Sequence, residues 1–457
     1  MKKEIILPFI TALVFCSSVS FAQRITTVAG SSVFGYAGDG GAATAANFYN
    51  VDCVAVDPKG RIFISDRDAM AFSIIRMIDT NGIVHTFAGT GVTGFSGDRG
   101  SATAAQIDFP YGIAFDKKGN VYFVDGTNKR IRKIDTSGVI TTFAGTGSSI
   151  VSGDGGPATM AGLGAGRGIC SDSVGNIYFS ASSYIRKIDT LGIITKIAGT
   201  GVAGYGGDGG MADTAKIGGV DQIAFDKFGN LFISDLQRVR KISTSGIIST
   251  IAGTGVRGFS GDGGSATACK LAEPVGVFPD DFGNLYISEA TNHRIRKVNN
   301  AGIITTIAGS GATGTGMGGY GGDGGPATAA KLSGPDEIWL TKNRYLYIAD
   351  HFNYRIRRID LKDTVFVNSV SELAAQAEDV QVYPNPSNSG NVFVNMTTTT
   401  GSEPAQLVIT DIAGTVVKEC AIKTNTETEL KLQLPAGLYF INASAGNKRW
   451  VKKVVVE

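Results

Sequence analysis

The sequence has 457 residues, of which 43% are hydrophobic and 18% are charged, and its formal net charge at pH 7 is +2. A net charge this close to zero creates no electrostatic field that would attract nucleic acid or another polyanion, so we expect no nucleic-acid partner. The 63 glycines follow no collagen-like period, although they are about twice the usual share, so we expect them in turns.

The first 22 residues have the pattern of a cleaved export signal. Two lysines precede an apolar run over residues 5–15, and Ser20 and Ala22 supply the small side chains of a cleavage site before Gln23. We therefore expect residues 1–22 to be removed during export. Beyond them, no apolar run approaches the roughly 20 residues that a membrane-spanning helix needs, so we expect no transmembrane segment.

Between residues 24 and 363 one pattern occurs six times, with a period of about 55 residues. A phrase of the form Ile-x-Thr-x-Ala-Gly ends at Gly30, Gly89, Gly145, Gly199, Gly253 and Gly309. A second phrase, of the form Ile-Arg-Lys-Ile, ends near Ile78, Ile134, Ile188, Ile242, Val298 and Ile359. The region begins with the first phrase and ends with the second. The first unit therefore has one extra strand at its start, and the last unit lacks its final strand.

Each repeat reads as four short strands. In the second repeat, residues 112–115 are apolar and residues 121–124 are β-branched or aromatic. Residues 130–134 then alternate apolar with basic side chains, before an edge strand at 139–143. This order is expected when the first strand lines a central channel and the last faces solvent. A fixed period of this kind is typical of a β-propeller. We predict an all-β, six-bladed β-propeller over residues 24–363, closed by its N-terminal strand.

Two motifs of the repeat resemble a known family. Asp-x-x-Gly-Asn-Val-Tyr-Phe-Val-Asp at residues 116–125, followed by Asn-x-Arg-Ile-Arg-Lys at 128–133, has close copies at 226–235 and 281–289. Gly-Asp-Gly-Gly loops join the blades, with Gly-Asp-Arg-Gly at residues 97–100. The pattern resembles the NHL-repeat propellers, and in particular a bacterial subset with such loops. Because that family includes protein-binding modules, lyases and proteins of unknown role, the resemblance implies a fold rather than an activity.

The start of the six inner strands is the candidate site. Aligning the repeats gives one column at the mouth of the channel, formed by Asp52, Tyr111, Arg167, Asp221, Val275 and Asp336. The next column contains Cys53, Gly112, Gly168, Gln222, Gly276 and Glu337. These positions vary while their surroundings repeat, so we expect ligand binding by Asp52, Tyr111, Arg167, Asp221, Asp336 and Glu337. The carboxylates could hold a hard cation such as Ca²⁺, through Asp52, Asp221 and Asp336, or grip a polar ligand. A solvated channel mouth that tolerates any polar residue would explain the same pattern. Apart from such a cation, we expect no cofactor.

The charged residues that recur in every blade are expected to be architectural. The loop aspartates are predicted to close turns beside a short helical segment; they are Asp39, Asp98, Asp154, Asp208, Asp262 and Asp323. Asp125, Asp235 and Asp350 are expected to pair with Arg130, Arg238 and Arg355. His293 and His351 occupy adjacent loop positions, where we expect them to be solvated.

The C-terminal residues read as a second domain. Residues 380–457 contain several alternating strands with glycine and proline turns, which predicts a small β-sandwich after a linker at 364–379. Tyr-Pro-Asn-Pro at 383–386, Leu-Pro-Ala-Gly-Leu-Tyr at 434–439 and the terminal valines resemble the C-terminal sorting domain of the type IX secretion system. The resemblance implies export by the type IX machinery, which would recognise residues 380–457. The protein is then expected to be released or attached to the cell surface.

Two functional classes follow. The first is a secreted or surface-attached binding or scaffold module for a protein or glycan. The second is a metal-assisted lyase or lactonase, with Asp52, Asp221 and Asp336 on the ion and Glu337, His293 or His351 moving a proton. No serine nucleophile elbow, phosphate loop or His-x-x-x-His pattern occurs in the sequence, which favours the binding module over an enzyme.

Overall fold

A computed structural model describes residues 20–68, 71–311, 318–341, 344–367, 380–387, 391–396, 402, 404–411, 416–445 and 448–456. The chain divides into two compact units, and the larger comprises Ala22–Val365. The expected export signal up to residue 19 and most of the expected linker, residues 368–379, lie outside the described residues. Among the described residues, no helix is long and apolar enough to cross a membrane.

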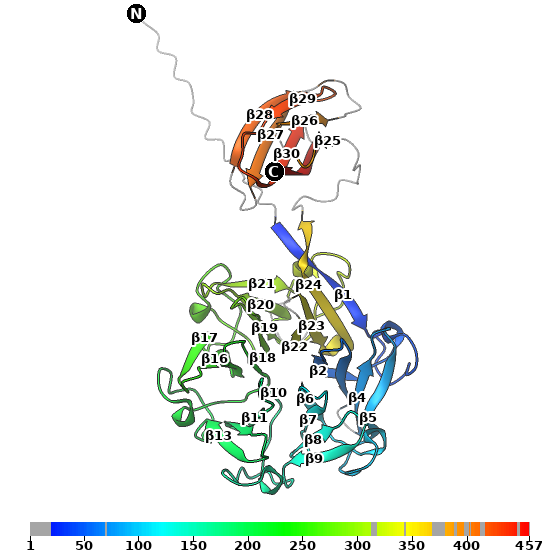
Figure 1. Ribbon diagram of the computed structural model, residues 1–457, viewed down its shortest axis with the longest axis vertical. Helices are drawn as coiled ribbons and strands as arrows, with labels where there is room; N and C mark the ends of the chain where they lie inside the picture. Colours follow the sequence, from blue (N-terminus) through cyan, green and yellow to red (C-terminus); the bar gives the residue numbers. More distant parts are fainter. Residues whose placement is uncertain are drawn as a thin grey trace, which may run out of the picture. The chain divides into compact units, whose positions relative to one another are not determined.

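In the described residues, the larger unit contains six four-stranded sheets, or blades, in an all-β propeller (Figure 1). Blade one consists of β2 (Asn50–Val56), β3 (Ile62–Arg67), β4 (Phe72–Ile78) and β5 (Val84–Val92). Blade two consists of β6 (Pro110–Phe115), β7 (Val121–Asp125), β8 (Arg130–Ile134) and β9 (Ile140–Ala144). Blade three consists of β10 (Ile169–Ser171), β11 (Ile177–Ala181), β12 (Tyr184–Ile188) and β13 (Ile194–Ala198).

The remaining blades follow the same order. Blade four consists of β14 (Ile223–Phe225), β15 (Leu231–Asp235), β16 (Arg238–Ile242) and β17 (Ile248–Ala252). Blade five consists of β18 (Pro274–Pro279), β19 (Leu285–Glu289), β20 (Arg294–Val298) and β21 (Ile304–Ala308). Blade six consists of β22 (Pro335–Thr341), β23 (Tyr345–Asp350), β24 (Arg355–Val367) and, as its outer strand, β1 (Ser20–Ala29).

The first strand of each blade lies toward the centre and the last toward the rim (Figure 1). Each inner strand contacts the inner strand of the next blade, and β2 contacts β22, so the ring is closed. The apolar cores lie between neighbouring blades. One core joins Phe63 and Ile75 of blade one to Phe123 and Ile134 of blade two. No blade could bury these side chains alone, which explains why the sequence must supply a complete ring.

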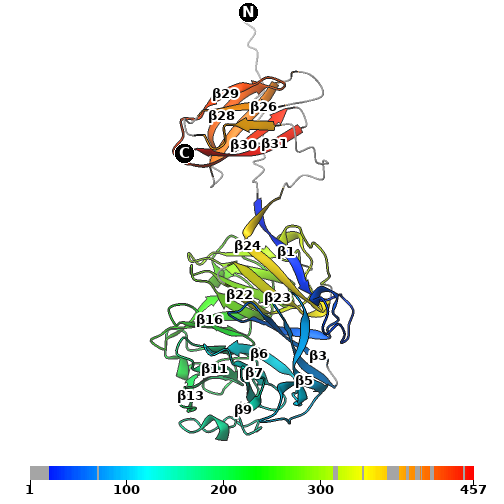
Figure 2. The same cartoon turned by 45° about the vertical axis from the view of Figure 1, so that its right-hand side comes forward.

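The predicted closure by the N-terminal strand is confirmed. β1 lies beside β24 in both views of the molecule (Figures 1 and 2). Ile25 accepts a hydrogen bond from the Gly324 N–H at 2.8 Å and donates one to the Gly325 carbonyl at 3.2 Å. The Ile25 side chain is fully buried in the core between blades five and six. A strand from the start of the sequence therefore completes the last blade.

The loop before each blade contains one turn of 3₁₀-helix. Within the described residues these turns are η1 (Ala43–Ala45), η2 (Ala102–Ala104), η3 (Ala158–Met160), η4 (Ala212–Thr214), η5 (Ala266–Ala268) and η6 (Ala327–Ala329). A seventh, η7 (His351–Asn353), follows β23. The helical turns that the sequence predicts are therefore present. No loop aspartate occupies an N-cap of these turns among the described residues.

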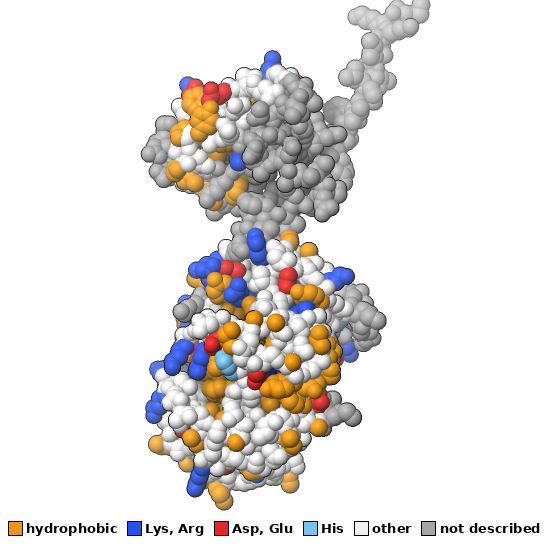
Figure 3. All heavy atoms as spheres, turned by 90° about the vertical axis from the view of Figure 1, so that its right-hand side faces the viewer, with side chains coloured by type: hydrophobic (Ala, Val, Ile, Leu, Met, Phe, Trp, Pro, Cys, Tyr) orange, Lys and Arg blue, Asp and Glu red, His pale blue; other side chains and the backbone are white. Residues whose placement is uncertain are grey.

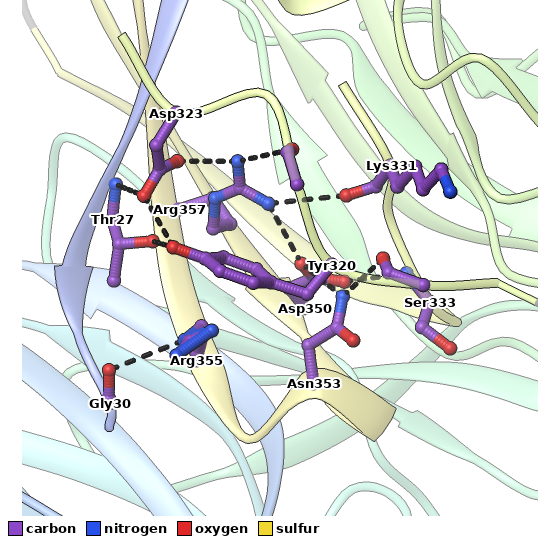
Figure 4. A network of polar contacts seen from close by, with 12 residues as sticks. Thr27, Gly30, Tyr320, Asp323, Lys331, Ser333, Asp350, Asn353, Arg355 and Arg357 are labelled. Atoms are coloured by element: carbon purple, nitrogen blue, oxygen red, sulfur yellow. Dashed lines mark hydrogen bonds and ion pairs between the residues drawn. The ribbon is translucent and has the colours of Figure 1, made fainter. Parts of the chain in front are cut away.

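The loop aspartates instead fasten strands of their own blade. In blade four, Asp208 accepts hydrogen bonds from Arg240 Nη2 on β16 (2.7 Å) and from the Thr250 N–H on β17 (2.9 Å). The same bridge between an arginine and a threonine is made by Asp39, Asp98, Asp262 and Asp323. In blade six the threonine is Thr27 of β1, which Figure 4 shows with Tyr320, Asp323 and Arg357. The repeated aspartate is thus architectural, as the sequence indicates.

The expected carboxylate–arginine pairs are displaced by two residues. Arg130 lies opposite Asp125 in the strand register, but its guanidinium lies over the Phe95 ring and donates to the Thr146 carbonyl. Arg132 is fully buried and places Nη1 3.2 Å from Asp125 Oδ2. Asp235 and Asp350 likewise pair with Arg240 and Arg357. The expectation was wrong because a fully buried carboxylate requires a buried cation.

The smaller unit contains two sheets in its described residues. One is formed by β25 (Val380–Tyr383), β26 (Asn391–Met396) and β29 (Thr428–Lys431). The other is formed by β27 (Pro404–Asp411), β28 (Val416–Lys423), β30 (Gly437–Ala445) and β31 (Lys448–Val456). Alternate residues such as Val392 and Val394 on β26, and Leu407 and Ile409 on β27, share one apolar core. This is the small β-sandwich that the alternating pattern predicts.

Candidate functional site

The predicted mouth residues lie where the inner strands leave regular pairing. The register shifts between Val51 and Val54 in blade one and between Pro335 and Ile338 in blade six. Asp52 and Glu337 fall within these two interruptions. A bulge turns side chains out of the ladder, so it can direct them toward the channel. The variable columns of the sequence therefore correspond to irregular backbone at the mouth.

A serine on the second strand holds this irregular backbone. The Ser65 hydroxyl accepts the Cys53 N–H at 2.9 Å, and the Ser234 hydroxyl accepts the Gln222 N–H at 3.1 Å. Ser180 and Ser288 do the same for Gly168 and Gly276. These buried N–H groups would otherwise lack a ladder partner. In blades one, three, four and five this serine thus fixes the backbone at the start of the inner strand.

Asp52 is the centre of an ionic cluster on one side of the mouth. It forms an ion pair with Arg67, whose Nη2 lies 3.1 Å from Asp52 Oδ1. His351 Nδ1 also lies 3.0 Å from Asp52 Oδ1 and 3.9 Å from Asp336 Oδ2. Burial disfavours the charged form, but the contact with His351 and the positive charge of Arg67 lower the pKa of Asp52. Asp52 therefore remains a carboxylate between two cations.

The pKa values of Asp336 and Glu337 shift in the opposite direction to that of Asp52. Burial and the charge of Asp52 raise the pKa of Asp336 well above its usual value. Burial and the charge of Asp221 raise the pKa of Glu337 to about 8. The pKa of His351 is also raised, because contact with Asp52 outweighs burial. The surroundings thus shift both acids toward the protonated form and His351 toward the cationic form, relative to the same groups in water.

The opposite side of the mouth is hollow. A cavity of about 330 Å³ lies between blades two, three and four, and its walls include Tyr111, Lys129, Arg167, Ser182, Gly219 and Asp221. Arg167 Nη1 lies 3.1 Å from Asp221 Oδ1, and the guanidinium lies 4.7 Å from the centre of the Tyr111 ring. Burial disfavours its charge, but Asp221 raises the pKa of Arg167, which therefore stays cationic. Burial raises the pKa of Asp221 although Arg167 acts in the opposite direction.

A third variable column explains why one side is filled and the other is hollow. It lies directly after the position near the end of the second strand that is Asp66 in blade one and Asp350 in blade six. Its members are Arg67, Gly126, Ser182, Leu236, Ala290 and His351. The large cationic members, Arg67 and His351, both reach Asp52. The small members, Gly126 and Ser182, border the cavity. Sequence reasoning missed Arg67 and Lys129 altogether, although this column varies in the same way as the two that it used.

The mouth residues do not form one continuous set. Among the described residues, Asp52, Asp336 and His351 have potential ligand atoms within 4.8 Å of one another. Asp221, which the sequence groups with Asp52 and Asp336 as a possible calcium set, is engaged by Arg167 instead. Val275 and Gln222 are buried, and Gln222 Nε2 donates to the Ile338 carbonyl at 2.8 Å. The two acidic centres are thus each neutralised by a neighbouring arginine.

The histidines are less exposed than expected. His293 is buried, and its Nδ1 accepts a hydrogen bond from the Gly334 N–H at 3.0 Å. His351 retains 13% of its side-chain exposure. The expectation of solvated loop histidines was wrong, because the loops that carry them fold over the ends of the inner strands. His85 is an exposed residue of β5, at the rim.

Glu337 should make the stability of the propeller fall as the pH rises. Its pKa of about 8 lies above the ordinary 4.5, so the folded state retains a proton that the unfolded chain releases. This contribution is complete below the ordinary pKa and is lost as the pH rises through the folded pKa. We expect Glu337→Gln to be relatively more stable than the parent at about pH 9 than at about pH 6. Urea unfolding of both proteins at each pH measures this difference, and parallel curves would contradict it.

Two family models match the chain. Residues 93–152 and 255–316 match the teneurin NHL domain, and residues 381–457 match the secretion system C-terminal sorting domain. Teneurin-1 of Gallus gallus is 32% identical over 285 residues, which are 54% of this chain and 10% of teneurin-1. Protein SUPPRESSOR OF QUENCHING 1 of Arabidopsis thaliana is 26% identical over 279 residues, 57% of this chain and 26% of that protein. The chain spans only a small part of these relatives.

Two solved structures with similar folds come from Bacteroides thetaiotaomicron VPI-5482. A structural genomics protein of unknown function aligns with a TM-score of 0.55 and 19% identity, over 75% of this chain and 76% of that one. An auxiliary nutrient binding protein aligns with a TM-score of 0.53 and 17% identity, over 74% of this chain and 76% of that one. Identities this low support a common fold, not a common ligand.

Proposed function

We propose that this chain, which is an NHL-repeat propeller with a C-terminal type IX sorting domain, is a binding module that acts outside the cell. It holds a protein or glycan ligand at the channel mouth and is either released or attached to the cell surface. The sorting domain supports the extracellular location, since such domains direct export. The auxiliary nutrient binding protein of similar fold is consistent with a binding role.

The cavity beside Arg167 is the observation that carries the binding role. Its volume of about 330 Å³ lies at the lower end of the roughly 300–1,000 Å³ of small-ligand sites. Its walls combine a phenol, a guanidinium, a carboxylate and hydroxyl groups, which suits a polar ligand or one polar end of a larger ligand. The Arg167–Asp221 contact orients both groups before a ligand arrives, and such preorganisation favours binding.

The surface around the blades agrees with a selective site. On the side of the propeller shown in Figure 3, basic and acidic side chains are interspersed with uncharged ones, and apolar side chains form small groups. No extended field of one sign covers the described residues on this side. A ligand would therefore be selected by the shape and chemistry of the mouth instead of by overall charge.

Loss of the mouth side chains should weaken ligand binding without unfolding the protein. We expect the mature protein to bind at least one member of a panel of cell-surface polysaccharides and proteins. The variant Tyr111→Ala/Arg167→Ala should bind that member at least about tenfold more weakly, since residues of this kind dominate binding energies. His85→Ala, at the rim, is the matched control. Equal binding by all three proteins, or no binding to the panel, would refute the proposal.

A metal-assisted lyase or lactonase is the second candidate. The ligand atoms that Asp52, Asp336 and His351 can bring together favour it. Arg67 opposes it, because its cationic group occupies the neighbourhood that a metal ion would share. Calcium would raise the unfolding midpoint of the parent, but not of Asp52→Asn/Asp336→Asn, if this candidate were correct. An unchanged midpoint in both proteins would favour the binding module.

Export from the periplasm to the cell surface should depend on the C-terminal domain. Deleting residues 380–457 removes most of the smaller compact unit and no residue of the larger one, Ala22–Val365. We expect a folded propeller that accumulates in the periplasm, measured by cell fractionation and protease resistance. Fusion of residues 380–457 to an unrelated periplasmic protein is the complementary experiment and should give surface export. Normal export of the truncated protein would contradict the assignment.

A further inference from the structure

The described walls of the cavity at the mouth carry more cationic than acidic side chains. Lys129 and Arg167 line it together with one acidic residue, Asp221. Asp221 is already engaged by Arg167 Nη1. Among the described wall residues Lys129 therefore has no carboxylate partner. Outside the wall its charge acts on Asp108, whose pKa is raised by burial and lowered by Lys129. A ligand that enters with a negative charge would complete this set.

Arg167 is held in a fixed orientation with part of its guanidinium open. The contacts with Asp221 and with the Tyr111 ring fix the plane of the group. Its side chain nevertheless keeps 42% of its exposure. A guanidinium has five N–H donors, and a single contact to Asp221 leaves donors for a second acceptor. A planar carboxylate matches the remaining fork in geometry and in charge.

Lys129 is specific to one blade although its backbone conformation is not. Lys129, His293 and Tyr354 occupy the same repeat position, with φ of 52°, 53° and 57°. The left-handed conformation is thus part of the architecture, whereas the side chain is free to differ. Lys129 Nζ donates to the Gly126 carbonyl at 2.9 Å, which places the ammonium at the cavity and leaves further N–H donors.

The other walls favour a saccharide over an acidic peptide. Hydroxyl groups of Thr127 and Ser182 and the carboxylate of Asp221 line the cavity, and Val220 is the largest aliphatic side chain among its described walls. Ring hydroxyls require many donors and acceptors at close spacing, and these groups supply them. Building on the proposed binding role, we propose that the cavity takes a hexuronate unit of an acidic polysaccharide, with its carboxylate on Arg167 and Lys129.

The test compares ligands that differ only in their carboxylate. The mature protein is titrated with uronate tetrasaccharides (galacturonate, glucuronate, mannuronate and guluronate types) and with their methyl esters, and affinities are measured by calorimetry. We expect at least one acid to bind, and its ester to bind at least about tenfold more weakly, as for loss of a charge-assisted contact. N-acetylglutamate provides a carboxylate without a sugar and should bind no more tightly than the ester.

Variants locate the binding. Arg167→Lys keeps the charge but loses the planar fork, and Lys129→Met removes the second cation; both should weaken the acid more than its ester. Gly219→Trp should block the site, because Gly219 lies in the cavity wall. A Cβ atom at this position would meet no protein atom within 4 Å, so the fold is expected to persist. His85→Ala should bind like the parent. Circular dichroism checks the fold of each variant.

The possible outcomes separate this inference from the proposed function. Equal affinity for acid and ester, unchanged binding by Gly219→Trp, or tight binding of N-acetylglutamate would overturn the hexuronate inference. If no uronate binds while another member of the panel binds at Tyr111 and Arg167, the inference fails and the binding module stands. If nothing binds at the mouth, both fail.

Discussion

Deletion of residues 24–30 is expected to destabilise the entire propeller, with one cooperative unfolding transition at a much lower temperature. The segment supplies the outer strand of blade six, and its side chains belong to two cores. Ile25 lies in the core between blades five and six, and Ala29 in the core shared by blades six and one. Its loss also exposes the edge of β24 to solvent. The midpoint is measured by circular dichroism on heating.

Point variants provide the scale for this effect. Ile25→Ala removes fully buried methyl groups and should lower the free energy of unfolding by about 2–5 kcal/mol. Thr27→Ala removes a hydroxyl contact to Tyr320 at the exposed rim and should have an effect of only about 1 kcal/mol. The deletion should exceed both, since whole domains have only about 5–15 kcal/mol of stability. An unchanged midpoint after the deletion would show that the ring does not depend on β1.

Replacing the buried arginine of blade four should destabilise far more than the same change in blade three. Arg240 pairs with Asp208 and with Asp235, which is almost fully buried. Arg186 pairs only with Asp154 among described carboxylates, because Ala181 occupies the strand position. Arg240→Met leaves a buried carboxylate without its partner and should lower the free energy of unfolding by about 3–5 kcal/mol. For Arg186→Met we expect about 1–3 kcal/mol, the effect of lost hydrogen bonds.

A second substitution tests the cause of this difference. In Arg240→Met/Asp235→Asn the buried charge is absent, although the oxygen of the introduced amide could still accept the Gly218 N–H that Asp235 now accepts. The double variant should therefore recover most of the difference between the two single variants. Denaturant unfolding at neutral pH gives the values. Equal losses in blades three and four, or no recovery in the double variant, would rule out uncompensated charge as the cause.

The fold could be predicted because the same sequence signals for turns and strands occur six times. Glycine turns, strand pairs and the surplus strand at residue 25 all indicate the same ring. The partner of Asp125 could not be predicted, because Arg130 and Arg132 are two residues apart and therefore lie on the same face of one strand. Only burial distinguishes them, since Arg132 lies inside the blade and Arg130 lies against Phe95. How deeply each arginine is buried depends on how the blades pack, and a short sequence motif does not specify this.

The candidate site could be predicted only in part. Aligned repeats gave Asp52, Tyr111 and Arg167, because residues that differ between blades stand out against a constant frame. His351 was expected to be solvated, yet it reaches Asp52 from the neighbouring blade. Arg67 was missed although it occupies the same repeat position as His351. Contacts between blades one and six depend on ring closure, so the separation of these residues along the sequence hides them.

Hydrogen–deuterium exchange with a bound ligand tests the central claim most directly. The mature protein is compared with and without the panel member that it binds, and exchange is followed by mass spectrometry. We expect slower exchange in the segments that line the cavity, residues 126–129, 165–167 and 219–221. The turns after the inner strands, residues 172–175 and 226–229, should be unchanged. Protection confined to those turns or to the outer strands would contradict a ligand at the channel mouth.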